Sequence, residues 1–291
     1  MTKMTASRFD VFERGGDAGV LLCHGITGAP AEMKPLVRRL VRAGFTVSCP
    51  ALAGHCSTLR ELKKTRWTDW YATLESALEA LRERCSTIFV SGLSMGALLA
   101  LKLAADHPDA VQGVATLSAT FVYDGWNVPQ FARRFLLPLA LYTPLRYVYS
   151  WHESPPFGIK DERIRNIVAA VYAGDAAQMP EKYGYSEFPA VTIRETFRLI
   201  KAVTRDLGRV VAPLLIVHAT EDDMATLENA RFLAARVAST DVENFFVDDT
   251  YHVLTIDRRK HEVAARVTEF FLDRRMPDIL NPREIAHAND C

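Results

Sequence analysis

Short, continuously apolar runs alternate along the chain with segments in which apolar residues recur every three or four positions. The apolar runs predict six buried strands, at residues 19–25, 45–50, 87–92, 112–119, 212–219 and 242–248. The three- and four-residue spacing predicts five helices, at residues 31–44, 67–85, 95–107, 226–238 and 256–275. Strands that are apolar throughout and alternate with helices form parallel sheets covered on both faces. The pattern therefore predicts an α/β fold with a mostly parallel sheet and helices on both faces.

One long segment, residues 121–205, interrupts this alternation. It shows no convincing strand pattern and holds more than half of the chain's Phe, Tyr and Trp residues. Helical spacing is present at 128–142, 160–173 and 189–206. We therefore expect three parts in the chain. They are a core formed by residues 1–120 and 206–273, a helical cap inserted at 121–205, and a polar C-terminal extension at 274–291.

Composition narrows the class of protein only moderately. Lys plus Arg and Asp plus Glu are 35 each, so the formal net charge is zero and nothing favours a nucleic-acid partner. The N-terminus lacks an apolar signal segment, and no apolar run is long enough to span a membrane. The five cysteines include no pair with the spacing of a redox or zinc motif. The expectation is a cytoplasmic protein without a transmembrane segment; its oligomeric state is not indicated.

The stretch Gly92-Leu93-Ser94-Met95-Gly96 fits the pattern G-x-S-x-G. It follows a predicted strand and opens a predicted helix, which is the context that a nucleophile elbow requires. Such an elbow holds the serine in a strained conformation and exposes its hydroxyl at the end of the sheet. We therefore expect Ser94 to be a nucleophile.

A serine nucleophile needs a base, and the base needs an acid that orients it. Asp222 and Asp223 come directly after the strand at 212–219, and His252 follows the last strand. The chain order serine, aspartate, histidine is that of the hydrolases with this elbow. Two other carboxylates, Asp248 and Asp249, also precede His252, but they are too close in sequence to reach its ring easily.

The reaction also needs two backbone donors for the oxyanion. One should be the amide of Met95, directly after the nucleophile. The other should come from the loop after an early strand, and the sequence CHGITGAP offers the amide of Ile26 there. Gly25 and Gly28 would permit the close approach of this loop.

In these motifs the chain resembles the α/β-hydrolase superfamily, and in particular the bacterial carboxylesterases and monoacylglycerol lipases. The similar stretches are LLCHGITGAP, GHC, SGLSMGA, IVHATEDDM and YHVLTIDR, in this order. The resemblance implies the α/β-hydrolase fold, with residues 121–205 as a cap over the pocket. It implies Ser94 as nucleophile, His252 as base, Asp222 as orienting acid, and Ile26 and Met95 as oxyanion donors. The chain departs from the pattern at Cys56 and Ala97, where glycine is usual.

Taken together, the motifs predict a serine hydrolase that cleaves a small-molecule acyl ester through an acyl-enzyme. A thioesterase or acyltransferase acting on an acyl thioester would use the same three residues. A non-catalytic binding protein with the same fold is the least favoured alternative. The aromatic cap is expected to provide an apolar acyl pocket. No motif implies an organic cofactor or a metal.

Overall fold

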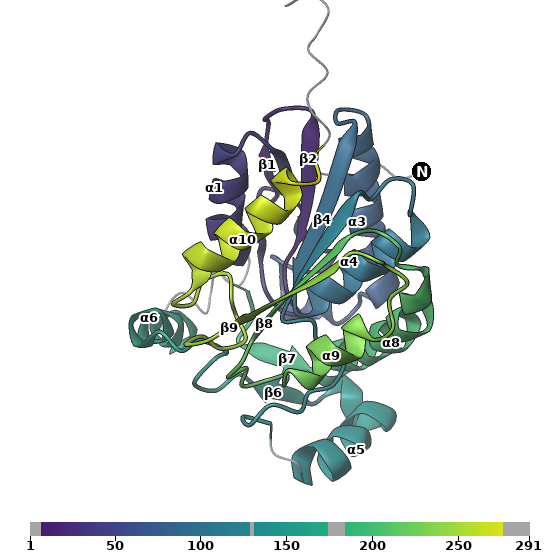
Figure 1. Ribbon diagram of the computed structural model, residues 1–291. Coiled ribbons are helices and arrows are strands. Elements are labelled where there is room, and N and C mark those ends of the chain that lie inside the picture. Colours follow the sequence, from purple (N-terminus) through teal and green to yellow (C-terminus); the bar gives the residue numbers. More distant parts are fainter. Residues whose placement is uncertain (1–6, 129–130, 174–183, 276–291) are drawn as a thin grey trace, which may run out of the picture.

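The computed structural model describes residues 7–128, 131–173 and 184–275. A seven-stranded sheet crosses the molecule in the order β1-β3-β2-β4-β5-β8-β9 (Figure 1). Neighbouring strands are parallel except for β1, which pairs antiparallel with β3. The strands are β1 (Val11–Glu13), β2 (Ala18–Cys23), β3 (Thr46–Cys49), β4 (Thr87–Leu93), β5 (Gly113–Leu117), β8 (Leu214–Ala219) and β9 (Val242–Val247). The mostly parallel sheet predicted from the apolar runs is confirmed.

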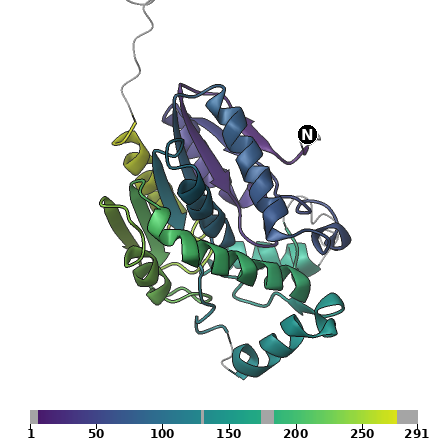
Figure 2. The ribbon, with the colours of Figure 1, turned by 90° about the vertical axis from the view of Figure 1, so that its right-hand side faces the viewer.

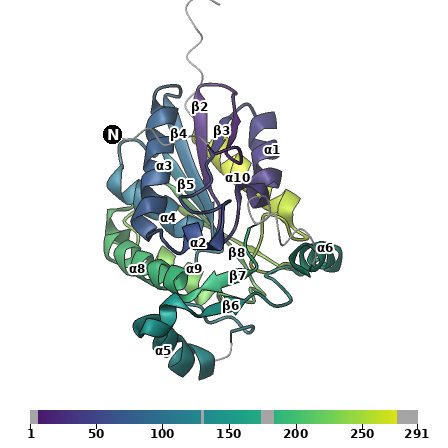
Figure 3. The ribbon, with the colours of Figure 1, turned by 180° about the vertical axis from the view of Figure 1, so that it is seen from behind.

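Helices cover both faces of the sheet because alternate strand residues point to opposite sides. On one side α1 (Lys34–Arg42) and α10 (Lys260–Leu272) pack together over the face that holds Val20 and Phe89. On the other side α3 (Trp67–Arg82), α4 (Met95–Asp106) and α8 (Ala190–Asp206) cover the face that holds Leu21 and Val90 (Figure 3). The described residues also include α2 (Leu59–Leu62) and α9 (Glu228–Ala234). The two-faced cover agrees with the central strands β2, β4, β5 and β8, which are buried throughout.

Most of the segment between β5 and β8 lies beyond the end of the sheet where the parallel strands finish, and its last helix, α8, returns to pack against α4 (Figures 1 and 2). Its helical parts are a π-helical turn η2 (Ala132–Leu136), α5 (Leu137–Tyr142), a 3-10 turn η3 (Pro144–Tyr147) and α6 (Glu162–Ala173), followed by α8. The helices expected at 160–173 and 189–206 are confirmed. Of the helix expected at 128–142, η2 and α5 form Ala132–Tyr142, and residues 129–130 lie outside the described part.

Three short strands, β1, β6 and β7, are not predicted by the hydrophobic pattern. β1 is three residues long and half-exposed at the edge of the sheet. In the cap, β6 (Ser150–His152) pairs antiparallel with β7 (Glu187–Pro189), with Trp151 opposite Phe188. The expectation that residues 121–205 contain no strand is therefore wrong. Three residues are too few to show a period of two, and the partner strand is distant in sequence.

The four cysteines within the described residues, Cys23, Cys49, Cys56 and Cys85, are buried and form no disulfide there. Cys291 and most of the predicted extension at 274–291 lie outside the described part. No helix in the described segments has the length and apolar character needed to cross a membrane. The same segments contain no group of three His, Cys, Asp or Glu side chains arranged to hold a metal ion.

Candidate active site

Ser94 lies at a sharp turn between β4 and α4, and its backbone has a φ of +55°, which is strained for a serine. Both flanking glycines are needed for this turn. A Cβ on Gly92 would lie 2.2 Å from the carbonyl oxygen of Gly96, and a Cβ on Gly96 would lie 2.4 Å from that of Cys23. The start of α4 is thus pressed against both its own strand and the end of β2. This is the geometry of a nucleophile elbow.

The three side chains selected from the sequence lie within hydrogen-bond distance of one another. His252 Nε2 is 2.9 Å from Ser94 Oγ, and His252 Nδ1 is 2.9 Å from Asp222 Oδ2 and 3.0 Å from Oδ1. All three residues are buried. They follow β4, β8 and β9, whose carboxyl ends meet at one edge of the sheet. Parallel strands thus bring residues that are far apart in sequence into one chain of hydrogen bonds.

Asp222 is fixed by the turn in which it lies. Its Oδ1 accepts hydrogen bonds from the amides of Met224 at 2.9 Å and Ala225 at 2.8 Å. Burial raises its pKa, but His252, with smaller contributions from His218 and the Ala225 amide, outweighs burial and holds the pKa below its usual value, so that the carboxyl group is ionised. His218 is fully buried in β8, where its Nε2 lies 2.8 Å from the Ala225 carbonyl oxygen. The carboxylate therefore stays ionised beside the imidazole.

The neighbouring Asp223 is buried as well, but its carboxylate contacts the backbone of His252 instead of the imidazole ring. Its Oδ1 accepts a long hydrogen bond of 3.4 Å from the amide of His252, and its Oδ2 has no hydrogen-bond partner. Burial raises the pKa of this carboxyl group. Asp222, and not Asp223, is therefore the carboxylate placed against the imidazole.

The two carboxylates before the histidine are engaged elsewhere. Asp248 accepts a hydrogen bond from the hydroxyl of Thr220 at 2.7 Å. Asp249 forms ion pairs with Arg258 at 2.8 Å and Lys160 at 3.3 Å. Neither carboxylate is within hydrogen-bond distance of the imidazole, in keeping with their short separation from it in sequence.

Asp257 holds the loop that carries the histidine. Its carboxylate accepts from the Thr250 hydroxyl at 2.9 Å and from the amide of Tyr251 at 2.8 Å. The same group accepts from two amides of the cap, those of Lys160 at 3.0 Å and Asp161 at 2.8 Å. One buried carboxylate thus ties the histidine loop to the cap.

His252 lies in an acidic environment. Burial lowers its pKa, but the charge and hydrogen bond of Asp222, with smaller contributions from Asp223 and Glu153, outweigh burial and raise the pKa above its usual value. An imidazolium formed beside Ser94 is therefore stabilised. This is the requirement for a group that takes up a proton from the serine.

The sequence analysis missed two glutamates near this histidine. Burial raises the pKa of Glu32 and of Glu153 to about 7 each. The Glu153 carboxylate accepts a hydrogen bond from the Tyr172 hydroxyl at 3.0 Å. Glu32, seven residues after Gly25, could have been found as the first acidic residue behind the glycine-rich loop. Glu153 follows the short strand β6 in the cap, and no local pattern marks it.

Both amides expected to bind an oxyanion lie on segments next to Ser94. Met95 is the first residue of α4, so its amide has no partner within the helix. The loop that carries Ile26 also runs beside the serine, since a Cβ on Gly25 would lie 3.9 Å from the Ser94 Cβ. The Gly25 amide is already used, because it donates to Glu32 Oε1 at 2.5 Å. Ile26 is thus the next amide that the loop can offer.

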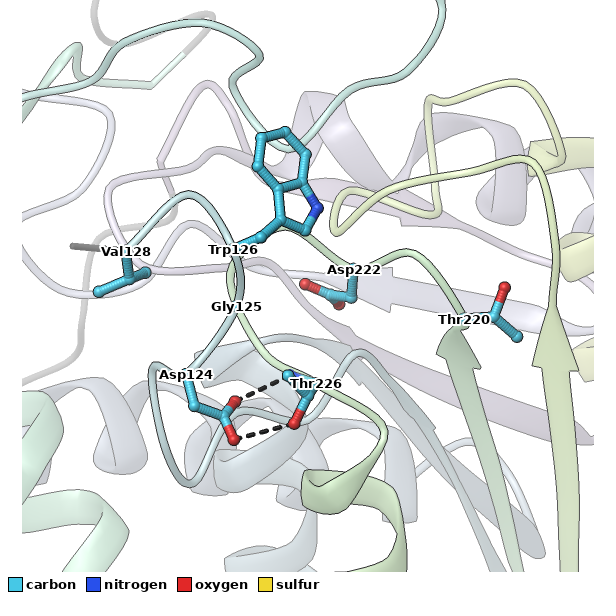
Figure 4. Close-up of a pocket in the computed structure, with 7 residues that line it drawn as sticks. All are labelled: Asp124, Gly125, Trp126, Val128, Thr220, Asp222 and Thr226. Atoms are coloured by element: carbon cyan, nitrogen blue, oxygen red, sulfur yellow. Dashed lines mark hydrogen bonds between the residues drawn. The ribbon is translucent and has the colours of Figure 1, made fainter. Parts of the chain in front are cut away.

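A pocket of about 480 Å³ lies beside Asp222 (Figure 4). It is lined by Asp124, Gly125, Trp126, Val128, Thr220, Asp222 and Thr226. Asp124 accepts from both the amide and the hydroxyl of Thr226 at 2.8 Å, which fixes one wall (Figure 4). Ser94 does not line this pocket, so the space adjoins the carboxylate and not the nucleophile.

Comparison with known proteins agrees with this geometry. A family model described as serine aminopeptidase, S33, matches residues 16–259. A thermostable monoacylglycerol lipase of Bacillus sp. (strain H-257) is 31% identical over 264 residues, 89% of this chain and 92% of that protein. A carboxylesterase of Bacillus subtilis (strain 168) is 26% identical over 265 residues, 88% and 93% of the two chains.

Solved structures give the same fold. One described with the metagenome-derived lipolytic enzymes LipS and LipT superposes with a TM-score of 0.77 at 26% identity, over 92% of this chain and all of that one. The monoacylglycerol lipase of Paleococcus ferrophilus gives a TM-score of 0.75 at 19% identity, covering 92% and 99% of the two chains. The chain therefore has the α/β-hydrolase fold and belongs to the serine aminopeptidase, S33, family.

Proposed function

We propose that this protein is a serine hydrolase that cleaves small-molecule carboxylic esters through an acyl-enzyme. The observation that carries the proposal is the continuous hydrogen-bonded chain from Asp222 through His252 to Ser94. The choice of esters rests on the relatives, which are a monoacylglycerol lipase and a carboxylesterase. We therefore place monoacylglycerols and other esters with an apolar acyl group first among its substrates.

In the proposed reaction His252 Nε2 takes the proton of Ser94 Oγ as this oxygen attacks the ester carbonyl carbon. The amides of Ile26 and Met95 hold the negative charge that develops on the carbonyl oxygen. The intermediate collapses, and His252 returns the proton to the departing alcohol. A water molecule, activated by the same imidazole, then releases the acid and restores Ser94. Side chains, backbone amides and water suffice for every step, so the proposal calls on no cofactor.

Replacement of the nucleophile tests the mechanism. Ser94→Ala should lower kcat for a p-nitrophenyl or glycerol ester on the order of 10⁶-fold, because no other group can form the acyl-enzyme. Ser91→Ala is the matched control: Ser91 is buried in β4 and its hydroxyl has no hydrogen-bond partner. It should retain activity. Turnover by Ser94→Ala at the wild-type rate would contradict the proposal.

Two further measurements separate the alternatives. A fluorophosphonate probe should label the wild-type protein and fail to label His252→Ala, whereas a binding protein would not be labelled. Oxygen esters and thioesters of the same acyl group, compared by kcat/KM, should favour the oxygen ester. A clear preference for the thioester would assign the same machinery to a thioesterase or acyltransferase.

A further inference from the structure

The carboxylate of Glu32 contacts the loop that is expected to supply the second oxyanion donor. Glu32 lies in the 3-10 turn η1 (Pro30–Met33), directly after that loop. Its Oε1 accepts from the amide of Gly25 at 2.5 Å. A Cβ on Gly28 would lie 2.5 Å from Oε2, so the carboxylate rests flat against the loop backbone at both of its glycines.

The carbonyl oxygen of Gly25 accepts hydrogen bonds from two other groups, the amide of Gly28 and the ring of His24. Gly28 donates its amide to the Gly25 oxygen at 3.2 Å. His24 Nε2 accepts from the Leu52 amide at 3.1 Å, and burial lowers the pKa of His24 to about 4. The neutral ring therefore carries its proton on Nδ1, which donates to the Gly25 oxygen at 2.9 Å. Both polar backbone groups of Gly25 are thus held before any substrate arrives.

Fixing Gly25 also fixes the next amide. The carbonyl and N–H of a trans peptide lie in one plane and point in opposite directions. When the Gly25 carbonyl is turned toward His24 and Gly28, the N–H of Ile26 must point the other way. The amide of Gly25 is withdrawn from the site by Glu32, which leaves the Ile26 amide as the donor that the loop offers to the oxyanion. Donors that are oriented in advance stabilise an oxyanion without reorganisation during the reaction.

We propose that Glu32 is a positioning residue: by accepting from the amide of Gly25 it fixes the His24–Gly25 peptide and with it the start of the loop, so that the Ile26 amide is directed at the oxyanion. The proposal rests on the proposed function, because it concerns the same oxyanion site. Glu32 acts as a hydrogen-bond acceptor at a fixed reach and does not touch the substrate. Its effect should therefore appear in the chemical step and not in substrate binding.

Three substitutions separate the acceptor, its reach and its charge. Glu32→Gln keeps an acceptor oxygen and removes the charge, Glu32→Met keeps the length and removes the acceptor, and Glu32→Asp keeps the charge but shortens the reach. Loss of one oxyanion donor costs roughly 10² to 10³ in kcat, which sets the upper limit for its displacement. We expect Glu32→Met and Glu32→Asp to lower kcat about 10- to 100-fold with KM nearly unchanged. The kcat of Glu32→Gln should stay within about 3-fold of the wild-type value.

Glu195→Met is the matched control. Glu195 is a buried glutamate on α8 that pairs with Arg198 at 2.6 Å, so its loss tests the general effect of removing a buried carboxylate. Thermal unfolding of every variant shows whether it is folded, and Glu32→Asp supplies a second acceptor-displaced protein should the Met variant unfold. The control should change the unfolding temperature without changing kcat.

The rate of fluorophosphonate labelling of Ser94 completes the test, because that reaction also places negative charge on an oxygen in the same site and needs no ester substrate. It should fall in Glu32→Met and Glu32→Asp in parallel with kcat. Unchanged kcat and labelling in both, a change confined to KM, or a loss in Gln as large as in Met would overturn the proposal. Failure of the proposed function would appear differently, as wild-type protein without ester turnover that depends on Ser94.

Discussion

The elbow helix α4 and the cap helices α5 and α6 differ in how closely neighbouring atoms constrain them. Every residue of α4 from Met95 to Ala105 is buried, whereas α6 has no buried residue and α5 has only two. Around α5, Phe131, Phe135 and Tyr142 are 67%, 55% and 66% exposed. Many of the aromatic side chains expected to line an acyl pocket therefore face outward. The groups proposed to react belong to the constrained region, whereas neighbouring atoms place few constraints on the side chains of α5 and α6.

The largest expected effect concerns the choice between two adjacent carboxylates in the constrained region. Asp222→Asn should lower kcat roughly 10⁴-fold, because the amide cannot orient and stabilise the imidazolium. Asp223→Asn is the comparison and should lose much less, since the Asp223 carboxylate accepts from the amide of His252 and not from its ring. Steady-state kinetics on one ester measures both. Equal losses in the two variants would show that the two carboxylates act as one unit.

A smaller effect is expected when the elbow is crowded. Gly96→Ala should lower the free energy of unfolding by about 2–4 kcal/mol, because its methyl group would meet the backbone oxygens of Cys23 and His24. Gly208→Ala offers the comparison: a Cβ there has no atom within 4 Å, so stability should hardly change. Chemical denaturation measures both. A wild-type midpoint for Gly96→Ala would mean that the constraint on α4 is weaker than its burial indicates.

A substitution in the cap should lower the free energy of unfolding most where the cap is hydrogen-bonded to the core, at Tyr185. The Tyr185 hydroxyl donates to the Gly54 carbonyl at 2.9 Å and accepts from the Ser57 amide at 3.0 Å, while its own amide donates to the Thr27 carbonyl at 2.8 Å. Tyr185→Phe keeps the ring and should cost about 1–2 kcal/mol of unfolding free energy through the two lost hydrogen bonds.

Tyr142→Phe, on the exposed face of α5, removes a hydroxyl without removing a buried contact, and denaturation should find it as stable as wild type. If both tyrosine variants lost stability equally, the contrast between the anchored and the outer cap would fail.

The smallest effect is a displacement of the pH profile. His252 must be neutral to accept the serine proton, and its pKa is raised, so kcat/KM should rise with pH through a value above 6.5. The Glu153 carboxylate favours the imidazolium. Glu153→Gln should therefore move this acid limb to lower pH, by less than ~1 unit.

Glu187→Gln, on the neighbouring strand β7, is the control for this displacement and should leave the limb in place. Movement of the Glu153→Gln limb toward higher pH would contradict the assigned direction.

The sequence predicts the core around α4 better than it predicts the cap. The strands of the core and the placement of Ser94, Asp222 and His252 at one sheet edge depend on local apolar runs and on a parallel topology, both of which leave marks in the sequence. The choice between Asp222 and Asp223 depends on which carboxylate the amides of Met224 and Ala225 capture, and a difference of one position leaves no such mark.

The short strands β6 and β7 and the approach of Glu153 to the histidine could not be predicted for a different reason. They are long-range pairings made by segments too short to carry a period. Glu32 lies between these cases: its position behind the glycine-rich loop is visible in the sequence, but its hydrogen bond to Gly25 is visible only in three dimensions.

The direct pairing of β5 with β8 has a consequence for how such proteins diversify. Leu117, near the point where the chain leaves the sheet, lies opposite Val217 on the strand by which it returns. The sheet is therefore continuous beneath the inserted segment, and the register of its strands does not depend on what that segment contains. Exchange of the insertion between relatives would leave the pairing of the strands that precede Ser94 and Asp222 unchanged. Replacement of the inserted segment between β5 and β8 is therefore a route by which evolution can change the substrates of such an enzyme.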